Sequence, residues 1–418
     1  MNIYKKYITL LLLGFSGGAI FVFPYLKYIF YDDVLVSLGI GNADSGLLLT
    51  AYSLGCVALY IPGGILADKL SPRVSIVTSL CAATALTLIF ALFFNFAAAI
   101  VVWFLMAFAS GFIFWSAVLK AVRIISEEKN QGMMYGVYYS ANGAATALIN
   151  YACLKVFGYA GGGSHGLLMA VLLMAFCTGI SALGLFFFLK GFEKLETKKE
   201  EQFSFSDLSQ VVKNPSIWMV SVIFFCTYAV YTCSSYYTPY LTYLGLSSDS
   251  SAELSILRIN IAMMIASPVG GYLADKVFKS TIKWIAYGST LLALSILATF
   301  YVGGSNLTLT SILSIIPGWI VMSMYGIMFS ALKEINIPVK VSGTVIGVTS
   351  IISYSPDLFM NTLYGTVLDS YTGAETITAY QIIFTSLATI SVLSVILSLC
   401  VLYRIKENKT RAVEPLIN

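Results

Sequence analysis

Long apolar runs restrict the fold of this chain more than any other feature. An apolar helix of about 20 residues spans the hydrocarbon of a bilayer, and these runs lack the period-two alternation of a membrane barrel. We therefore predict an all-α membrane protein with twelve transmembrane helices. The predicted spans are residues 7–30, 45–67, 73–94, 97–122, 132–158, 165–189, 216–244, 251–273, 281–302, 307–332, 341–367 and 376–403.

The composition supports this prediction and excludes several classes of function. Of 418 residues, 58% are hydrophobic and 11% charged, whereas a soluble domain carries about a quarter charged residues. The net charge of +4 is spread over short loops, so we expect no nucleic-acid partner. The seven cysteines show no metal-binding spacing, and no Walker sequence is present. We expect neither an enzyme active site nor a metal or other cofactor.

The positions of Lys and Arg predict the orientation. If both termini are cytoplasmic, all 24 Lys and Arg residues except Lys27, Lys155 and Arg258 lie on the cytoplasmic side or at helix ends facing it. This agrees with the excess of positive charge in cytoplasmic loops. The compact loops favour a bacterial inner (plasma) membrane, and we expect a monomer.

The two halves of the sequence repeat one another. Four segments recur in the same order and at similar spacing, as in proteins built from internal repeats. The pairs are FPYLKY (Phe23–Tyr28) with TPYLTY (Thr238–Tyr243), GGILADKLS (Gly63–Ser71) with GGYLADKVF (Gly270–Phe278), LKAVRI (Leu119–Ile124) with LKEINI (Leu332–Ile337), and Gly132 and Gly136 with Gly343 and Gly347.

The repeat predicts the domain organisation. Two parallel six-helix repeats joined by a linker are an arrangement found in secondary transporters. We predict an N-terminal six-helix bundle (1–190), a cytoplasmic linker (191–215), a C-terminal six-helix bundle (216–404) and a cytoplasmic tail (405–418).

The loop motif Gly63-Gly64-x-x-Ala67-Asp68-Lys69-x-x-x-Arg73, with its partial copy Gly270-Gly271-x-x-Ala274-Asp275-Lys276, resembles the major facilitator superfamily. The resemblance covers essentially the whole chain, and spans 1, 4 and 5 are similar to carriers of sugar-phosphate and organic-acid anions. It implies that this motif latches the cytoplasmic ends of the two halves. The implied gating residues are Gly64, Asp68, Arg73, Gly271 and Asp275. The alternative is that the loop charges only set the topology.

Polar side chains follow one face of spans 5, 7 and 11 at helical spacing. Polar groups facing lipid would lack hydrogen-bond partners, so these faces are predicted to line a central cavity or to join helices by hydrogen bonds. Lys27, Arg258 and Asp357 lie within predicted spans, and a charge near the centre of the membrane costs at least about 2.5 kcal/mol. We predict that Arg258 attracts an anionic group and that Asp357, directly after the helix-loosening Pro356, is its counter-ion or a proton switch. The alternatives are a buried Arg258–Asp357 pair that fixes packing, and a Lys27 that extends toward the membrane surface.

The sequence therefore predicts a secondary active transporter for a small organic solute, most simply an anion. It works by alternating access as a symporter or antiporter, driven by a proton or counter-solute gradient. One alternative is a carrier of neutral or cationic solutes with Asp357 as the recognition group, and another is a non-transporting membrane receptor or scaffold. The candidate substrate-binding residues are Tyr25, Lys27, Tyr139, Asn142, Tyr231, Arg258, Ser353, Asp357 and Asn361.

Overall fold

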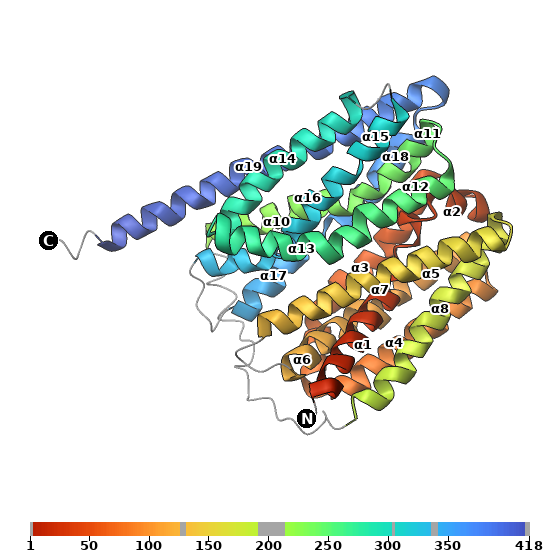
Figure 1. Ribbon diagram of the computed structural model, residues 1–418, viewed down its shortest axis with the longest axis horizontal. Helices are drawn as coiled ribbons and strands as arrows, with labels where there is room; N and C mark the ends of the chain where they lie inside the picture. Colours follow the sequence, from red (N-terminus) through yellow and green to blue (C-terminus); the bar gives the residue numbers. More distant parts are fainter. Residues whose placement is uncertain (1–2, 126–130, 191–213, 303–305, 336–341, 414–418) are drawn as a thin grey trace. The chain divides into compact units, whose positions relative to one another are not determined.

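The computed structural model describes residues 3–125, 131–190, 214–302, 306–335 and 342–413. All regular structure in these ranges is helical, and the predicted all-α fold with twelve spans is confirmed (Figure 1). The predicted linker, 191–215, lies almost entirely outside the described residues.

The helices agree with the predicted spans to within a few residues, except that α19 continues beyond the predicted end of the last span. The elements are α1 Ile3–Val22, η1 Leu26–Tyr28, α2 Tyr31–Leu38, α3 Asn42–Lys69, α4 Pro72–Leu92, α5 Phe96–Ala107, η2 Phe108–Phe114, α6 Trp115–Ile125, α7 Gln131–Tyr159, α8 Gly163–Phe188, α10 Pro215–Cys233, η5 Ser234–Tyr236, α11 Tyr237–Tyr243, α12 Ser248–Ser255, η6 Ile256–Ile261, α13 Ala262–Tyr272, η7 Leu273–Val277, α14 Thr281–Leu297, η8 Ala298–Val302, α15 Leu307–Leu313, α16 Ile315–Tyr325, η9 Met328–Ile335, α17 Ser342–Tyr354, α18 Pro356–Asp369, η11 Gly373–Glu375 and α19 Thr376–Val413.

Two predicted spans differ from the others: α7 is less apolar, and the α17–α18 pair is divided into helices of 13 and 14 residues. In the described part of the chain nine helices are long and apolar enough to cross a membrane, and α2 with the first part of α3, bent by 101°, is a tenth candidate. The spans that do not reach this level are α7 and the α17–α18 pair. They carry two of the polar faces that the sequence predicts, and α17 ends just before Pro356, where the proline interrupts the helix.

The chain forms two compact contact units that do not coincide with the two sequence halves. Unit 1 contains Met1–Glu196, Ser235–Met264 and Asp357–Ala379, and unit 2 contains Thr197–Ser234, Ile265–Pro356 and Tyr380–Asn418. The elements α11, α12, η6 and, except for Pro356, α18 all come from the second half of the sequence and belong to the same unit as α1 to α8. The division into two six-helix bundles therefore stays a prediction from the sequence repeat.

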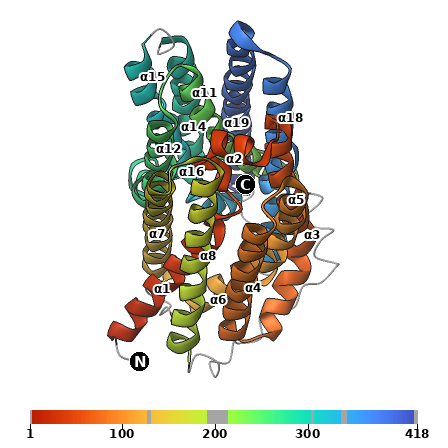
Figure 2. The same cartoon turned by 90° about the vertical axis from the view of Figure 1, so that its right-hand side faces the viewer.

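In unit 1, α1 packs closely along α7, and α8 lies beside both α7 and α4 (Figure 1, Figure 2). Glycines on α1 permit this approach. A Cβ at Gly18 would lie 2.9 Å from both the Ala145 Cβ and the Asn142 carbonyl oxygen, and a Cβ at Gly17 would lie 2.5 Å from the Asn142 amide nitrogen. Small residues replace side-chain bulk with backbone contact, as is common between membrane helices.

A second close approach in unit 1 joins α3 to α18, and we call it the α3–α18 seam. A Cβ at Gly46 would fall against the Asn361 backbone, and a Cβ at Gly365 would fall against the Asn42 backbone. The hydroxyls of Thr50 and Thr362 are 2.9 Å apart.

The Asp369 carboxylate completes the seam by binding the first turn of α3. It accepts hydrogen bonds from the backbone N–H groups of Asn42 (3.0 Å) and Ala43 (2.7 Å) and from the Asn42 side chain (2.7 Å). A carboxylate at this position satisfies N–H groups that have no partner within the helix.

Unit 2 has its own close contacts. A Cβ at Gly270 on α13 would fall against the backbone of Ser323 on α16. The Glu334 carboxylate accepts a hydrogen bond from the Ser280 hydroxyl (2.5 Å) and another from the Thr281 backbone N–H, and so binds the start of α14.

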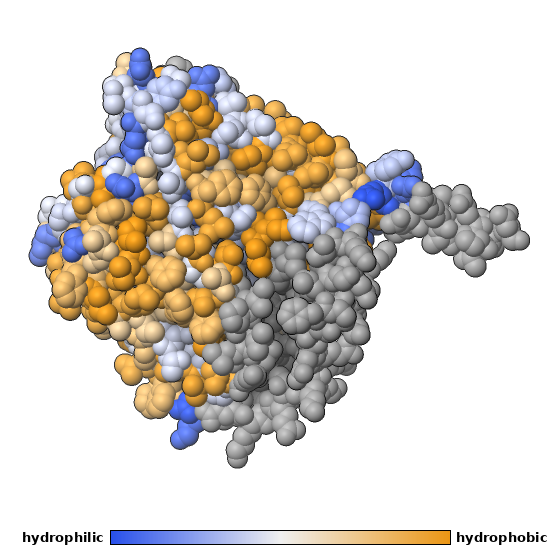
Figure 3. Space-filling view, turned by 180° about the vertical axis from the view of Figure 1, so that it is seen from behind, coloured by the Kyte–Doolittle hydropathy of each residue, from blue (hydrophilic) through white to orange (hydrophobic). Residues whose placement is uncertain are grey.

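The described surface carries the apolar side chains of a membrane protein. Large hydrophobic residues such as Leu92, Leu148 and Phe187 are more than half exposed. On the face in Figure 3, most of the described surface is hydrophobic. This exposure agrees with helices that face lipid.

The α3–α18 seam predicts an asymmetric response to adding a methyl group. Gly46→Ala should lower the thermal unfolding midpoint, because the new methyl meets backbone that cannot rotate away; such overpacking costs about 1–3 kcal/mol. Gly158→Ala is the matched control on α7, where an added Cβ would meet no atom within 4 Å, and it should be neutral or stabilising. Equal midpoints for the two variants would contradict the close approach.

Candidate substrate-binding site

Three charged side chains are buried among those that the structure describes, and all three belong to unit 1. Lys27 is 4% exposed, Arg258 0% and Asp357 2%. They come from η1, η6 and α18, which are far apart in the sequence. Buried charges are costly at membrane depth and commonly mark functional sites.

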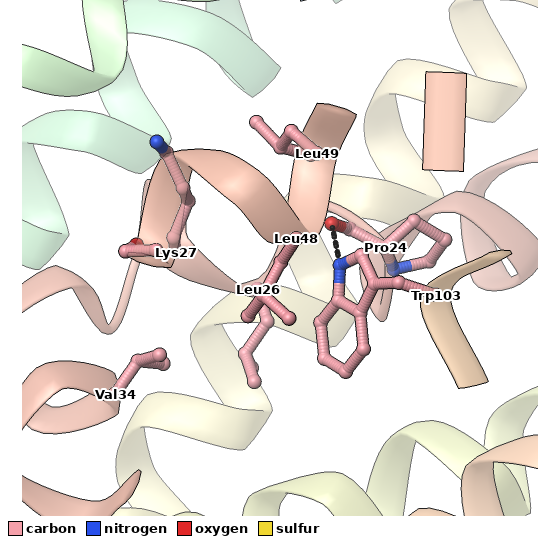
Figure 4. Close-up of a pocket in the computed structure, with 8 residues that line it drawn as sticks. Pro24, Leu26, Lys27, Val34, Leu48, Leu49 and Trp103 are labelled. Atoms are coloured by element: carbon pink, nitrogen blue, oxygen red, sulfur yellow. Dashed lines mark hydrogen bonds between the residues drawn. The ribbon is translucent and has the colours of Figure 1, made fainter. Parts of the chain in front are cut away.

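Lys27 lies in the turn that follows Pro24 at the end of the first span. Its carbon chain lines a cavity of about 10 Å³ together with Leu26, Leu48 and Trp103, and the Trp103 indole donates to the Pro24 carbonyl at 2.9 Å (Figure 4). The amine points away from Trp103 in this view.

The Lys27 amine contacts two aromatic rings. Its Nζ is 5.2 Å from the ring centroid of Tyr236 and 5.6 Å from that of Tyr31. The negative face of an aromatic ring attracts a cation in this geometry.

Arg258 is arranged in a parallel way on a π-helical turn, η6. Its guanidinium carbon is 4.9 Å from the ring centroid of Tyr237. Because Tyr236 and Tyr237 are consecutive, the two buried cations contact neighbouring rings at the η5–α11 junction. π-helical turns are frequent at functional sites.

Asp357 lies in the first turn of α18, where the positive end of the helix dipole favours a carboxylate. Its Oδ2 accepts a hydrogen bond from the Tyr25 hydroxyl at 3.3 Å. The Tyr25 ring in turn packs against the edges of Tyr28 (5.2 Å) and Tyr52 (5.9 Å). The carboxylate therefore lies beside a group of three tyrosine side chains, Tyr25, Tyr28 and Tyr52.

Asn361, one turn after Asp357, is fully buried and also contacts a tyrosine. The Tyr236 hydroxyl donates to its backbone carbonyl at 2.5 Å. Tyr236 thus contacts both Lys27 and α18. Four of the predicted residues, Lys27, Arg258, Asp357 and Asn361, contact Tyr25, Tyr236 or Tyr237.

The polar face of α7 is turned inward in unit 1. Asn142 is buried beside Gly17 and its carbonyl accepts from the Thr146 hydroxyl at 2.9 Å, while Leu148 on another face is exposed. Asn150 donates to Asn260 of η6 at 3.1 Å. The half-buried Tyr139 packs on Tyr138 with ring centroids 5.1 Å apart.

The other two predicted binding residues belong to unit 2. Tyr231 stacks on Tyr325, with ring centroids 4.9 Å apart and an interplanar angle of 20°. Tyr228 and Tyr354 extend this aromatic cluster at 5.4 Å and 4.7 Å. Ser353 donates to the Thr349 carbonyl of its own helix at 2.6 Å.

The predicted gating residues are described only in part. Gly64 and Asp68 belong to α3, but their side-chain surroundings lie outside the described residues. Arg73 donates to the Phe186 carbonyl at 2.9 Å and covers its ring at 4.4 Å. Asp275 is exposed on η7, and a Cβ at Gly271 would meet only Ile327 at 3.8 Å. The tight contact is at Gly270 instead.

Comparison with known protein families agrees with the fold. A family model described as Major Facilitator Superfamily matches residues 7–360. The chain belongs to the major facilitator superfamily. It is an integral, multi-pass membrane transporter and not an enzyme.

Two relatives of this transporter are Escherichia coli proteins. Inner membrane protein YqcE is 26% identical over 384 residues, which are 90% of each chain, and inner membrane protein YihN is 24% identical over 412 residues, 97% of each chain. Among solved structures, a bacterial homolog of the human lysosomal transporter Spinster, inward-facing and unoccupied, has a TM-score of 0.74 at 14% identity and covers 97% of this chain and 98% of its own. The nucleoside transporter NupG has a TM-score of 0.69 at 14% identity, covering 96% and 99%.

Sequence reasoning missed the tyrosines that connect the transporter's buried charges. Tyr31, Tyr236 and Tyr237 contact Lys27 or Arg258, and Asn260 binds Asn150. A signal was present, because Tyr236 and Tyr237 directly precede the repeated segment Thr238–Tyr243. Tyrosine alone, however, does not indicate which cation its ring will contact.

The short helix α2, which lies outside the predicted spans 7–30 and 45–67, predicts a pH effect. Burial, followed by the negative charges of Asp32 and Asp249, raises the pKa of Asp33 to about 6. Since folding raises this pKa above the unfolded value of 3.8, the folded protein binds the proton more strongly. Stability therefore falls as the pH rises from about 4 to about 6, and the loss is complete above that range.

Asp33→Asn removes the ionisable group, so it should raise the thermal unfolding midpoint at pH 7.5 and have little effect near pH 4. The exposed Glu375, changed to Gln, is the control and should not show this pattern. Unfolding midpoints of the purified protein between pH 4 and pH 8 test the prediction. A benefit that is the same at both ends of the range would contradict it.

Proposed function

We propose that this transporter is a secondary active carrier that moves a small organic anion by alternating access. The observation that carries the proposal is that unit 1 buries two cations and one carboxylate, and that each of these three groups contacts a tyrosine side chain. Two buried cationic side chains in one unit suit a ligand that carries a carboxylate or phosphate group.

The contacts of the two cations suit exchange with an anionic ligand. An aromatic ring stabilises a buried cation by about 2 kcal/mol or more, but it does not neutralise the charge. A carboxylate or phosphate forms charge-assisted hydrogen bonds with Lys27 and Arg258, and these are stronger at low dielectric. Rings hold the cations in place when the site is empty, and an anion competes for them when it arrives.

Asp357 is the proposed coupling group. Its carboxylate accepts from Tyr25 and belongs to the same unit as Lys27 and Arg258. Protonation removes the negative charge and increases the net positive charge available to the anion. A proton and an anion that bind in this linked way move together, which makes proton symport the simplest form of the proposal; exchange against a counter-anion is the other form.

A carrier of neutral solutes is the second candidate, and the aromatic cluster of unit 2 is the observation that favours it. The stacked Tyr231 and Tyr325 rings present a flat surface that suits a planar or cyclic solute. The nucleoside transporter NupG shares the fold, but 14% identity transfers no substrate. In this case Lys27 and Arg258 have a structural role.

Both candidates place the transporter in the same membrane. We propose cytoplasmic N- and C-termini, on the distribution of Lys and Arg, and a bacterial inner membrane, as in the two Escherichia coli relatives.

A ligand screen tests the choice between the two candidates. Thermal-shift measurements against a panel of anionic metabolites and neutral nucleosides, at pH 6 and pH 8, should identify anions that stabilise the protein. Lys27→Met and Arg258→Gln should each weaken that binding about tenfold or more, because each removes a charged hydrogen-bond donor. Lys155→Met is the control, since Lys155 is an exposed cation paired with Glu253 at 3.0 Å.

The comparison of pH 6 with pH 8 tests whether proton binding is coupled to anion binding. If Asp357 carries the proton, stabilisation by the anion should be stronger at pH 6 than at pH 8, and Asp357→Asn should remove that difference. Stabilisation by nucleosides that survives both Lys27→Met and Arg258→Gln would favour the neutral-solute carrier. Proteoliposome uptake of the best ligand, with and without a proton gradient, then distinguishes a transporter from a receptor.

A further inference from the structure

Tyr236 occupies a singular position among the tyrosines of unit 1. It is fully buried at the end of η5, and it contacts both Lys27 of η1 and Asn361 of α18. Its ring is 5.2 Å from the Lys27 amine, and its hydroxyl donates to the Asn361 carbonyl at 2.5 Å.

Asn361 belongs to the α3–α18 seam as well as to the candidate site. Its backbone is the surface against which Gly46 packs, and the next residue, Thr362, meets Thr50 across the seam. Two turns further along α18, Asp369 binds the first N–H groups of α3. Tyr236 is therefore hydrogen-bonded to the helix that closes the seam.

We propose that Tyr236 is a positioning residue that couples the Lys27 amine to closure of the α3–α18 seam. This inference rests on the proposed function only in assigning Lys27 to the anion; the coupling itself concerns the ligand-free protein. With no ligand, the amine attracts the ring and holds the hydroxyl against Asn361. An anion at Lys27 draws the amine away from the ring, so the Tyr236–Asn361 hydrogen bond loses its support and the seam opens more readily.

Other groups around Tyr236 keep its ring in this orientation. The Tyr31 ring lies 5.9 Å away and contacts the same amine, and the Tyr364 ring of α18 lies 5.8 Å away, nearly perpendicular. A ring held on both sides transmits a change at the amine to α18 because it cannot adjust by rotating freely.

The seam contains a reporter that needs no added probe. The backbone N–H groups of Asn42 and Ala43 lie in the first turn of α3, where no earlier turn supplies a carbonyl, and they donate to Asp369 across the seam. Their exchange with solvent deuterium therefore reports opening of the seam. When reclosing is fast, the exchange rate is proportional to the open population.

Hydrogen–deuterium exchange of the full-length protein, with no ligand present, tests the coupling. Tyr236→Phe keeps the ring and removes the hydroxyl, and it should speed exchange at Asn42 and Ala43 about fivefold, the effect of losing one ordinary hydrogen bond. Lys27→Met should also speed exchange. The double variant should exchange no faster than the faster single variant, because both changes break the same link.

Three further variants make the result specific. Lys27→Arg keeps a cation near the ring and should retain the parent rate. Tyr243→Phe removes a phenol from a more exposed position at the end of the adjoining helix, α11, and should also retain it. Asp369→Asn weakens the seam directly and should give fast exchange whatever residue is at position 236.

The outcomes separate the two proposals. Parent-like exchange in Tyr236→Phe, or effects of Tyr236→Phe and Lys27→Met that multiply in the double variant, would overturn the coupling. An intact coupling together with anion stabilisation that is insensitive to Lys27→Met and Arg258→Gln would instead overturn the anion assignment alone.

Discussion

The structure depends on one constraint: a polar or charged group at membrane depth must find its partner inside the protein. Hydrocarbon offers no hydrogen bond, so each buried donor, acceptor or charge needs a neighbour from another helix or from its own backbone. Lys27 and Arg258 meet tyrosine rings, Asp357 accepts from Tyr25, and Asn150 meets Asn260. The same requirement selects aromatic hydroxyl side chains, which combine an apolar body with a polar end.

Glycine permits these polar contacts because it lets helix backbones approach one another closely. On α1 the glycines admit α7, and at Gly46 and Gly365 they allow α3 and α18 to contact through backbone atoms. Asp369 uses this proximity to bind the start of α3. Close packing and polar contacts therefore occur on the same surfaces, and a change in one is felt by the other. Two segments from the second half of the sequence, Ser235–Met264 and Asp357–Ala379, belong to unit 1, where Tyr236, Asp357 and Asp369 make these contacts.

The fold was largely predictable, and the candidate site only in outline. The spans followed from hydrophobic length, and the break before α18 followed from Pro356, because both signals are local. Burial of Lys27, Arg258 and Asp357 could be expected from the apolar sequence around them. Their partners could not be expected, since Tyr25 is 332 residues from Asp357 and Tyr236 is 125 residues from Asn361 along the chain. We predicted Gly271 as the gating glycine of the second loop motif, but Gly271 has room for a methyl group, whereas its neighbour Gly270 has none.

By itself, the sequence determined the membrane setting, the number of membrane spans, the internal repeat and the position of Arg258 and Asp357 within spans. These properties depend on residues that are neighbours in the chain, so periodicity and composition reveal them. Only the tertiary structure decided which ring meets which cation, which helix Asp369 binds, and that Tyr236 contacts both Lys27 and α18. Those contacts arise when helices distant in the sequence pack together, and they depend on rotation and close approach that no local pattern specifies.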